Sequence, residues 1–107
     1  MSSLRTQLLK GTTAMLVLEI LSEREAYGYE IAQAIGARSH GAFAPSEGAL
    51  YPALHRLEAD GAVTAAWRAG DRGPRRRYYR ITPAGQGLLA DTRELLKQLQ
   101  KLRKDMG

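Results

Sequence analysis

The chain contains no cysteine, one tryptophan, one phenylalanine and two histidines among its 107 residues. Without cysteine it can form no disulfide, no thiolate metal site and no thiolate nucleophile. The two histidines, His40 and His55, lack the spacing of a metal site. Glycine motifs for nucleotide phosphates and a nucleophile with its base are missing too. The sequence therefore predicts a protein that is not an enzyme, with no metal and no cofactor.

Long apolar runs are also missing. The longest, Ala14 to Leu21, is interrupted by Glu19 and is too short to span a bilayer. The first ten residues lack the apolar core and the cleavage site of a secretory signal. A hydrophobic content of 44% over 107 residues predicts one folded domain with a modest core. We expect a cytoplasmic protein with no membrane partner.

Positive charge is abundant and concentrated. The formal net charge is +5 and the sequence pI is about 9.9. The segment from Arg68 to Arg80 holds six arginines against one acid, Asp71. Such a local excess of arginine favours a polyanionic partner.

Two helices are predicted in the first half of the chain. Leu4, Leu8, Met15 and Leu18 share one side of the first helix, which Gly11 is expected to interrupt so that the helix restarts there. Its broad apolar face is typical of a core or a subunit interface. A second helix is expected from Gly28 to Arg38, followed by a glycine-rich loop that ends at residue 45. The second helix should bury Ile31, Ala34 and Ile35.

A third helix is predicted to open at Ser46, whose side chain can cap the first turn. Leucines at i, i+4 and i+7 define its buried face: Leu50, Leu54 and Leu57. Pro52 removes one backbone hydrogen bond, but it lies early enough for the helix to continue. Gly61 is expected to end the helix in a left-handed conformation.

Two strands, Val63 to Arg68 and Arg76 to Ile81, are predicted next, joined by a loop rich in glycine and proline. We call residues 62–82 the wing. Its arginines can meet DNA phosphates or enter a narrow minor groove. Arg77 alternates with Arg76 along the strand and could instead stack on Tyr79. Thr82 and Pro83 then form a helix start.

The side of the third helix opposite its leucines is the predicted reading face for DNA. It displays Gly48, Tyr51, Pro52, His55 and Arg56, with Ser46 and Glu47 at the N-terminal tip. The alternative is an ordinary solvated helix face. Tyr27 could anchor a phosphate beside the second helix, or it could be a buried aromatic. Trp67 is expected to pack rather than to stack on a ligand. The predicted DNA contacts are Tyr27, Ser46, Glu47, Gly48, Tyr51, His55, Arg72, Arg75, Arg76 and Arg77.

The last predicted helix, residues 83–107, carries a row of leucines wider than a two-stranded coiled coil needs. A monomer would expose this apolar row to water and tend to aggregate, so we expect a homodimer. The predicted dimer contacts are Leu4, Leu8, Leu88, Leu95, Leu99 and Leu102. An aliphatic effector pocket is a further expectation, with Met15, Leu89 and Leu96 as its lining.

Three motifs together resemble the PadR family of bacterial transcriptional regulators. They are the segments 27–31 (YGYEI), 50–58 (LYPALHRLE) and 75–82 (RRRYYRIT), the last followed by Gly85. The similarity extends over nearly the whole chain from about Leu8. It implies a homodimeric winged helix-turn-helix that binds a pseudo-palindromic operator, usually as a repressor, and it implies that Pro52 is tolerated. Many members release DNA when a small effector binds. The last helix here lacks the aromatic residues that could stack on such a ligand.

The fold prediction is a mainly α protein with a small β-hairpin, in one structural domain. Residues 1–82 would form a winged helix-turn-helix and residues 83–107 a C-terminal dimerisation helix. The expected partners are double-stranded DNA, a second copy of the chain and a small hydrophobic effector. A protein-interaction module whose basic wing binds an acidic protein is an alternative, because the fold alone cannot decide. A ligand sensor that acts without DNA and an RNA-binding protein also stay open, although a rigid helix suits the groove of B-form DNA better.

Overall fold

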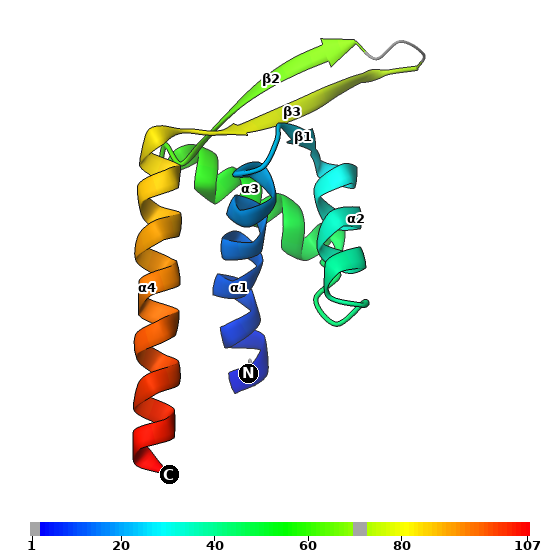
Figure 1. Cartoon of the computed structure of the whole chain (residues 1–107). Helices are drawn as coiled ribbons and strands as arrows, with labels where there is room; N and C mark the ends of the chain where they lie inside the picture. Colours follow the sequence, from blue (N-terminus) through cyan, green and yellow to red (C-terminus); the bar gives the residue numbers. More distant parts are fainter. Residues whose placement is uncertain (1–2, 70–72) are drawn as a thin grey trace.

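Four helices and one three-stranded sheet make up the parts of the chain that the structure describes, residues 3–69 and 73–107 of a computed structural model (Figure 1). This arrangement confirms the predicted winged-helix fold, mainly helical with a small hairpin and a C-terminal helix. In chain order the elements are α1 (Leu4–Leu21), β1 (Ala26–Tyr27), α2 (Gly28–Arg38), α3 (Glu47–Ala59), β2 (Val63–Ala69), β3 (Arg75–Ile81) and α4 (Pro83–Met106).

The core lies where α1, α2 and α3 meet beneath the sheet. Leu18, Ile31 and Leu54 are almost inaccessible to solvent at its centre. The three predicted core leucines of α3 are buried, as are Ile31 and Ile35 of α2, whereas Ala34 is only partly buried. The predicted break at Gly11 is wrong, because α1 is continuous. Packing of the apolar side chains later in α1 offsets the roughly 1 kcal/mol that glycine costs a helix.

The two ends of α3 differ in how well they match the prediction. Ser46 is the N-cap residue, but its side chain makes no capping hydrogen bond, so that part of the prediction is wrong. Ser46 is exposed, and water can therefore satisfy the first-turn N–H groups. At the other end Gly61 has φ of +75°, as predicted, and the N–H of Ala62 donates to the carbonyl of Leu57 at 2.8 Å.

The sheet is antiparallel with the order β1-β3-β2. The two long strands form the predicted hairpin, each one residue longer than expected, with Trp67 opposite Arg77 and Arg68 opposite Arg76. The sequence did not predict β1, because two residues are too few to show an alternating pattern. Ala26 and Tyr27 pair with Tyr79 and Tyr78, so β1 fixes the base of the wing to the start of α2.

The last helix begins as predicted, with the Thr82 hydroxyl accepting from the N–H of Gly85 at 3.0 Å. It runs beside α1 and continues past the rest of the molecule (Figure 1). The radius of gyration is 15.0 Å, above the roughly 13 Å expected for a compact domain of this length. Within residues 3–69 and 73–107, no helix combines the length and apolar character needed to cross a membrane.

Candidate nucleic-acid interface

The reading face of α3 is open to solvent along its length. Since Leu50, Leu54 and Leu57 point into the core, the opposite side of the helix is exposed. The exposed residues on and beside it are Glu47, Gly48, Tyr51, Pro52, His55 and Arg56, with Ser46 at the tip. The helix continues through Pro52, as predicted. The described geometry therefore leaves this face accessible, while its contacts with bases remain predictions.

Tyr51 connects the reading face to α2. A Cβ built on Gly28 would lie 2.9 Å from the Tyr51 hydroxyl and 3.2 Å from two of its ring carbons. The tyrosine ring therefore lies directly against the first residue of α2, in space that a side chain at position 28 would occupy. Tyr51 is still 42% exposed, so the contact orients the ring without removing it from solvent.

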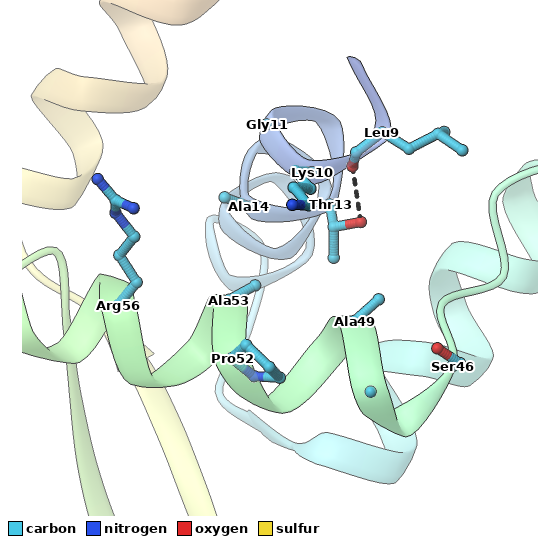
Figure 2. Close-up of a pocket in the computed structure, with 11 residues that line it drawn as sticks. Leu9, Lys10, Gly11, Thr13, Ala14, Ser46, Ala49, Pro52, Ala53 and Arg56 are labelled. Atoms are coloured by element: carbon cyan, nitrogen blue, oxygen red, sulfur yellow. Dashed lines mark hydrogen bonds between the residues drawn. The ribbon is translucent and has the colours of Figure 1, made fainter. Parts of the chain in front are cut away.

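The other flank of α3 faces α1 across a hollow of about 710 Å³ (Figure 2). Ala49, Pro52 and Ala53 contribute from α3, and Lys10 and Thr13 from α1. Arg56 stands at one end of this hollow, with its guanidinium directed away from the middle of α3 (Figure 2). Ser46, Gly48 and Pro52 line this hollow as well, so it borders the reading face along one side, and the extent of that face stays a prediction.

The arginines of the wing fall into two groups. Arg75 is exposed near the start of β3, and Arg76 lies with its guanidinium carbon 4.7 Å from the centre of the Tyr27 ring. Neither takes part in the ion pairs found among the described residues, which leaves both available to phosphates. Arg72 lies outside the described residues, and its predicted contact with DNA remains a prediction.

Arg77 belongs to the second group, which is engaged by carboxylates. Its Nη2 donates to Oε2 of Glu58 on α3 at 2.7 Å, and its guanidinium carbon lies 5.7 Å from the centre of the Tyr79 ring. This geometry matches the alternative that placed Arg77 on Tyr79. The contact connects the wing to the last turns of α3, and a role in binding phosphate is the less supported of the two predictions.

Glu25 engages two further wing arginines. This carboxylate precedes β1 and accepts hydrogen bonds from Arg68 of β2 and from Arg80 of β3. The hydrogen bond from Arg80 is the main cause that lowers the pKa of Glu25 below its ordinary value. Partial burial works in the opposite direction, and the charge of Arg68 adds to the lowering. Glu25 therefore stays ionised and bridges both long strands.

Tyr27 is a half-buried member of an aromatic cluster. Its ring meets Tyr78 edge to face at 5.4 Å and stacks on Tyr29 at 6.4 Å between centroids. Its backbone N–H donates to the Glu30 side chain at 3.2 Å, which caps α2. This packing favours the aromatic interpretation of Tyr27, and its contact with a phosphate remains a prediction.

Six leucines of α4 and α1 are exposed in the single chain. Leu95, Leu99 and Leu102 are each more than half exposed, and Leu88 is 43% exposed. Leu4 and Leu8 of α1 are 71% and 65% exposed. We call these six residues the leucine stripe. They form an apolar surface that the described part of the chain does not cover.

The structure differs from the prediction at the effector pocket and at Trp67. Leu89 is 3% exposed and belongs to the core, so it cannot line an open pocket beside Met15 and Leu96. The hollow described above lies between α1 and α3 instead (Figure 2). Trp67 was expected to pack, but it is 59% exposed on β2.

Sequence reasoning did not single out Glu25, Glu58, Arg68 or Arg80 as part of the site. Their ion pairs join segments far apart in the chain, and composition carries no signal for them. The alternation of residues along β3 was the available signal, because it places Arg77 on the face opposite Arg76, although Arg75 shares the face of Arg77.

Comparison with known proteins agrees with this geometry. The family model described as "Transcriptional regulator PadR-like family" matches residues 17–91. The chain is 40% identical over 92 residues to "Transcriptional regulator Rv3488" of Mycobacterium tuberculosis, covering 86% of this chain and 82% of the relative. It is 32% identical over 99 residues to "Uncharacterized protein X" of Lysinibacillus sphaericus, covering 92% and 88%.

Solved structures give the same result. A transcriptional regulator from Clostridium thermocellum superposes with a TM-score of 0.84 at 30% identity, covering 92% of this chain and 96% of that one. A PadR-like transcriptional regulator from Bacillus cereus superposes with a TM-score of 0.77 at 31% identity, covering 94% and 95%. The similarity includes both the helices and the wing.

Proposed function

The chain belongs to the PadR-like family of transcriptional regulators, whose members bind DNA, and we propose that it is a homodimeric repressor that recognises a pseudo-palindromic operator. The observation that carries the proposal is the exposed reading face of α3 beside a wing with two arginines, Arg75 and Arg76, that take part in none of the ion pairs among the described residues. A helix that enters the major groove while a basic hairpin meets the neighbouring phosphates needs these two surfaces together.

On this proposal each protomer inserts the reading face of α3 into one major groove. Glu47, Gly48, Tyr51 and His55 would lie nearest the bases, with Ser46 at the tip of the helix. Arg75 and Arg76 would bind phosphates beside the groove. Since Arg77 is engaged by Glu58, we assign it to holding the wing against α3.

A second copy of the chain is the partner that the leucine stripe supports. Burial of a side chain such as Leu99, which is 52% exposed, contributes about 1 kcal/mol or more. The stripe on α4 and α1 provides six such residues in each protomer. The dimer would set the distance between the two reading faces and thereby the spacing of the operator half-sites.

An effector receives no support from the contacts described above. The proposed partners are therefore DNA and a second protomer.

One observation favours the protein-interaction alternative. Trp67 is 59% exposed on the wing, and exposed tryptophans are frequent anchors of protein interfaces. The reading face offers one exposed aromatic, Tyr51, which lies against Gly28, while Gly48, Pro52 and His55 are poor anchors. DNA therefore remains the better-supported partner.

Selection of DNA from a random pool tests the proposal. Purified protein is mixed with duplexes that contain about 30 random base pairs, and bound duplexes are recovered over several rounds. We expect an enriched inverted repeat whose half-sites lie about 10 base pairs apart or a multiple of that spacing. A pool that stays random would contradict sequence-specific binding. We call the enriched sequence the selected duplex and a shuffled version of the same composition the scrambled duplex.

A further inference from the structure

The carboxylate of Glu25 contacts both long strands of the wing from outside the hairpin. Its Oε2 accepts from Nη2 of Arg68 on β2, and its Oε1 accepts from Nε of Arg80 on β3 at 3.1 Å and from the Nη2 of the same arginine. Glu25 itself lies in the segment that joins α1 to β1. One side chain therefore attaches both strands to the helical body.

A series of side-chain contacts leads from Arg68, the partner of Glu25, to Arg76 of the wing. The guanidinium carbon of Arg68 lies 4.1 Å from the centre of the Tyr78 ring, and Tyr78 meets Tyr27 at 5.4 Å. Tyr27 in turn lies under Arg76. Since these side chains share the outer face of the sheet, a change at Glu25 is passed by direct contact to an arginine that we assign to phosphate binding.

The opposite face of the sheet has its own attachment. Arg77 pairs there with Glu58 of α3. The two carboxylates therefore engage three of the five described wing arginines, from both faces of the hairpin. Arg75 and Arg76 are the two that remain, and their position depends on how the base of the hairpin is held.

We propose that Glu25 is a positioning residue for DNA recognition, which sets the orientation of the wing relative to α3 through Arg68 and Arg80. The inference rests on the proposed function, because it assumes that Arg75 and Arg76 meet phosphates while α3 lies in a groove. Glu25 itself touches no base and no phosphate in this proposal.

The proposal predicts a change in DNA affinity that is opposite in sign to the change expected from charge alone. A carboxylate near DNA repels phosphates, so its removal by Glu25→Gln should strengthen binding to every duplex if charge alone mattered. If Glu25 positions the wing, the same substitution weakens binding to the selected duplex. Binding to the scrambled duplex is unchanged or tighter, because Arg68 and Arg80 are released.

The matched control is Glu23→Gln. Glu23 is also a carboxylate paired with an arginine, but its partner is Arg38 at the end of α2. Both substitutions raise the net charge by one. Glu23→Gln breaks one ion pair away from the wing, whereas Glu25→Gln breaks the two that attach the wing. We expect Glu25→Gln to reduce the ratio of the two affinities, selected over scrambled, by about tenfold, and Glu23→Gln to leave it within about twofold. Equal ratios for both variants would overturn the proposal.

The salt dependence separates positioning from a lost phosphate contact. A variant that loses one phosphate contact has a log–log salt slope smaller by about 0.9. Glu25→Gln should keep or steepen its slope on both duplexes, since it frees cations and removes none. A smaller slope with an unchanged affinity ratio would overturn the proposal.

Arg80→Gln is the second variant, in case Glu25→Gln does not fold. It removes the contact of Glu25 with β3 and leaves the contact with Arg68 of β2. Circular dichroism and thermal unfolding establish which variants are folded. The double variant Glu25→Gln/Arg80→Gln should lose no more of the affinity ratio than Glu25→Gln alone, because Glu25→Gln already removes the contact with Arg80. Additive losses would contradict a shared role.

Hydrogen exchange in the absence of DNA separates this inference from the proposed function. We expect faster exchange in β2 and β3 of Glu25→Gln than in the unchanged chain or in Glu23→Gln. If the unchanged chain shows no preference for any duplex, the proposed function fails, while faster exchange still supports the attachment of the wing by Glu25. Unchanged exchange would overturn the attachment itself.

Discussion

Tyr51 of the recognition helix lies against Gly28, with its hydroxyl 2.9 Å from the place where a Cβ at position 28 would be. The absence of a side chain at one helix terminus therefore makes room for an aromatic ring on the next helix. A side chain at position 28 would therefore meet the Tyr51 ring in its present place. Both residues belong to the motifs that carry the family resemblance, and the structure gives a physical reason for their pairing.

Substitution of Gly28 by alanine should move the Tyr51 ring. We expect Gly28→Ala to lower the free energy of unfolding by about 1 kcal/mol and to weaken binding to the selected duplex. Thermal unfolding and fluorescence anisotropy measure the two effects. Gly11→Ala is the matched control, because nothing lies within 4 Å of a Cβ built on Gly11. A Gly28→Ala variant that binds DNA as the unchanged chain does would contradict a role for the Tyr51 contact.

Gly85 should tolerate substitution least. A Cβ at this position would lie 2.1 Å from the carbonyl oxygen of Ala62, which is backbone and cannot move aside easily. We expect Gly85→Ala to cost about 3 kcal/mol in the free energy of unfolding, measured by chemical denaturation. Gly87→Ala should be neutral or stabilising, since nothing lies within 4 Å of a Cβ built on Gly87 and alanine favours helix. Equal stability of the two variants would be inconsistent with the close approach of α4 to the turn after α3.

Arg76 and Arg77 should differ although they are neighbours. Arg76→Ala is expected to lower affinity about equally for all duplexes and to reduce the salt slope by about 0.9, as a lost phosphate contact does. Arg77→Ala should mainly lower stability, because it leaves Glu58 without its partner. Anisotropy titrations over a salt series and thermal unfolding distinguish the two outcomes. An unchanged affinity and slope for Arg76→Ala would rule out its assignment.

The leucine stripe predicts a stable dimer at micromolar concentration. Sedimentation analysis should give twice the chain mass, and Leu99→Lys should shift the protein toward monomer by placing a charge in an apolar interface. Gln100→Lys adds the same charge beside the stripe and should leave the dimer intact. A monomer mass for the unchanged chain at micromolar concentration would refute the dimer.

Acid should weaken the attachment of the wing. The pKa of Glu25 in the folded chain is below its ordinary value of 4.5, so its contribution to stability is present above about pH 4.5 and is lost as the pH falls through the lower folded value. As the pH is lowered from 5 through the folded pKa of Glu25, the Glu25→Gln variant should therefore lose less stability than the unchanged chain. Thermal midpoints of both proteins over this pH range provide the comparison.

Patterns within one element were readable from the sequence. The bounds of α2, the buried leucines of α3, the hairpin and the Thr82 cap all depend on neighbours a few residues away. The strand β1 was not predicted, because its two residues acquire their conformation by pairing with β3. The break expected at Gly11 was wrong for a related reason: local propensity was outweighed by packing along the rest of α1.

The candidate site was readable only in outline. The reading face follows from the position of the leucines, and its exposure could be predicted from periodicity. Which arginines are free could not, because Glu25 reaches residues 43 and 55 positions away. The predicted effector pocket shows the same limit, since burial of Leu89 depends on how α4 packs against α1.

Anisotropy titration of the unchanged chain against the selected and the scrambled duplex, over a salt series, tests sequence-specific binding by α3 and the wing. We expect the selected duplex to bind about a thousandfold tighter or more at physiological salt, with a steep salt slope on both. Weak binding of equal strength to both duplexes would contradict the proposed function. The wing would then bind polyanions without regard to sequence.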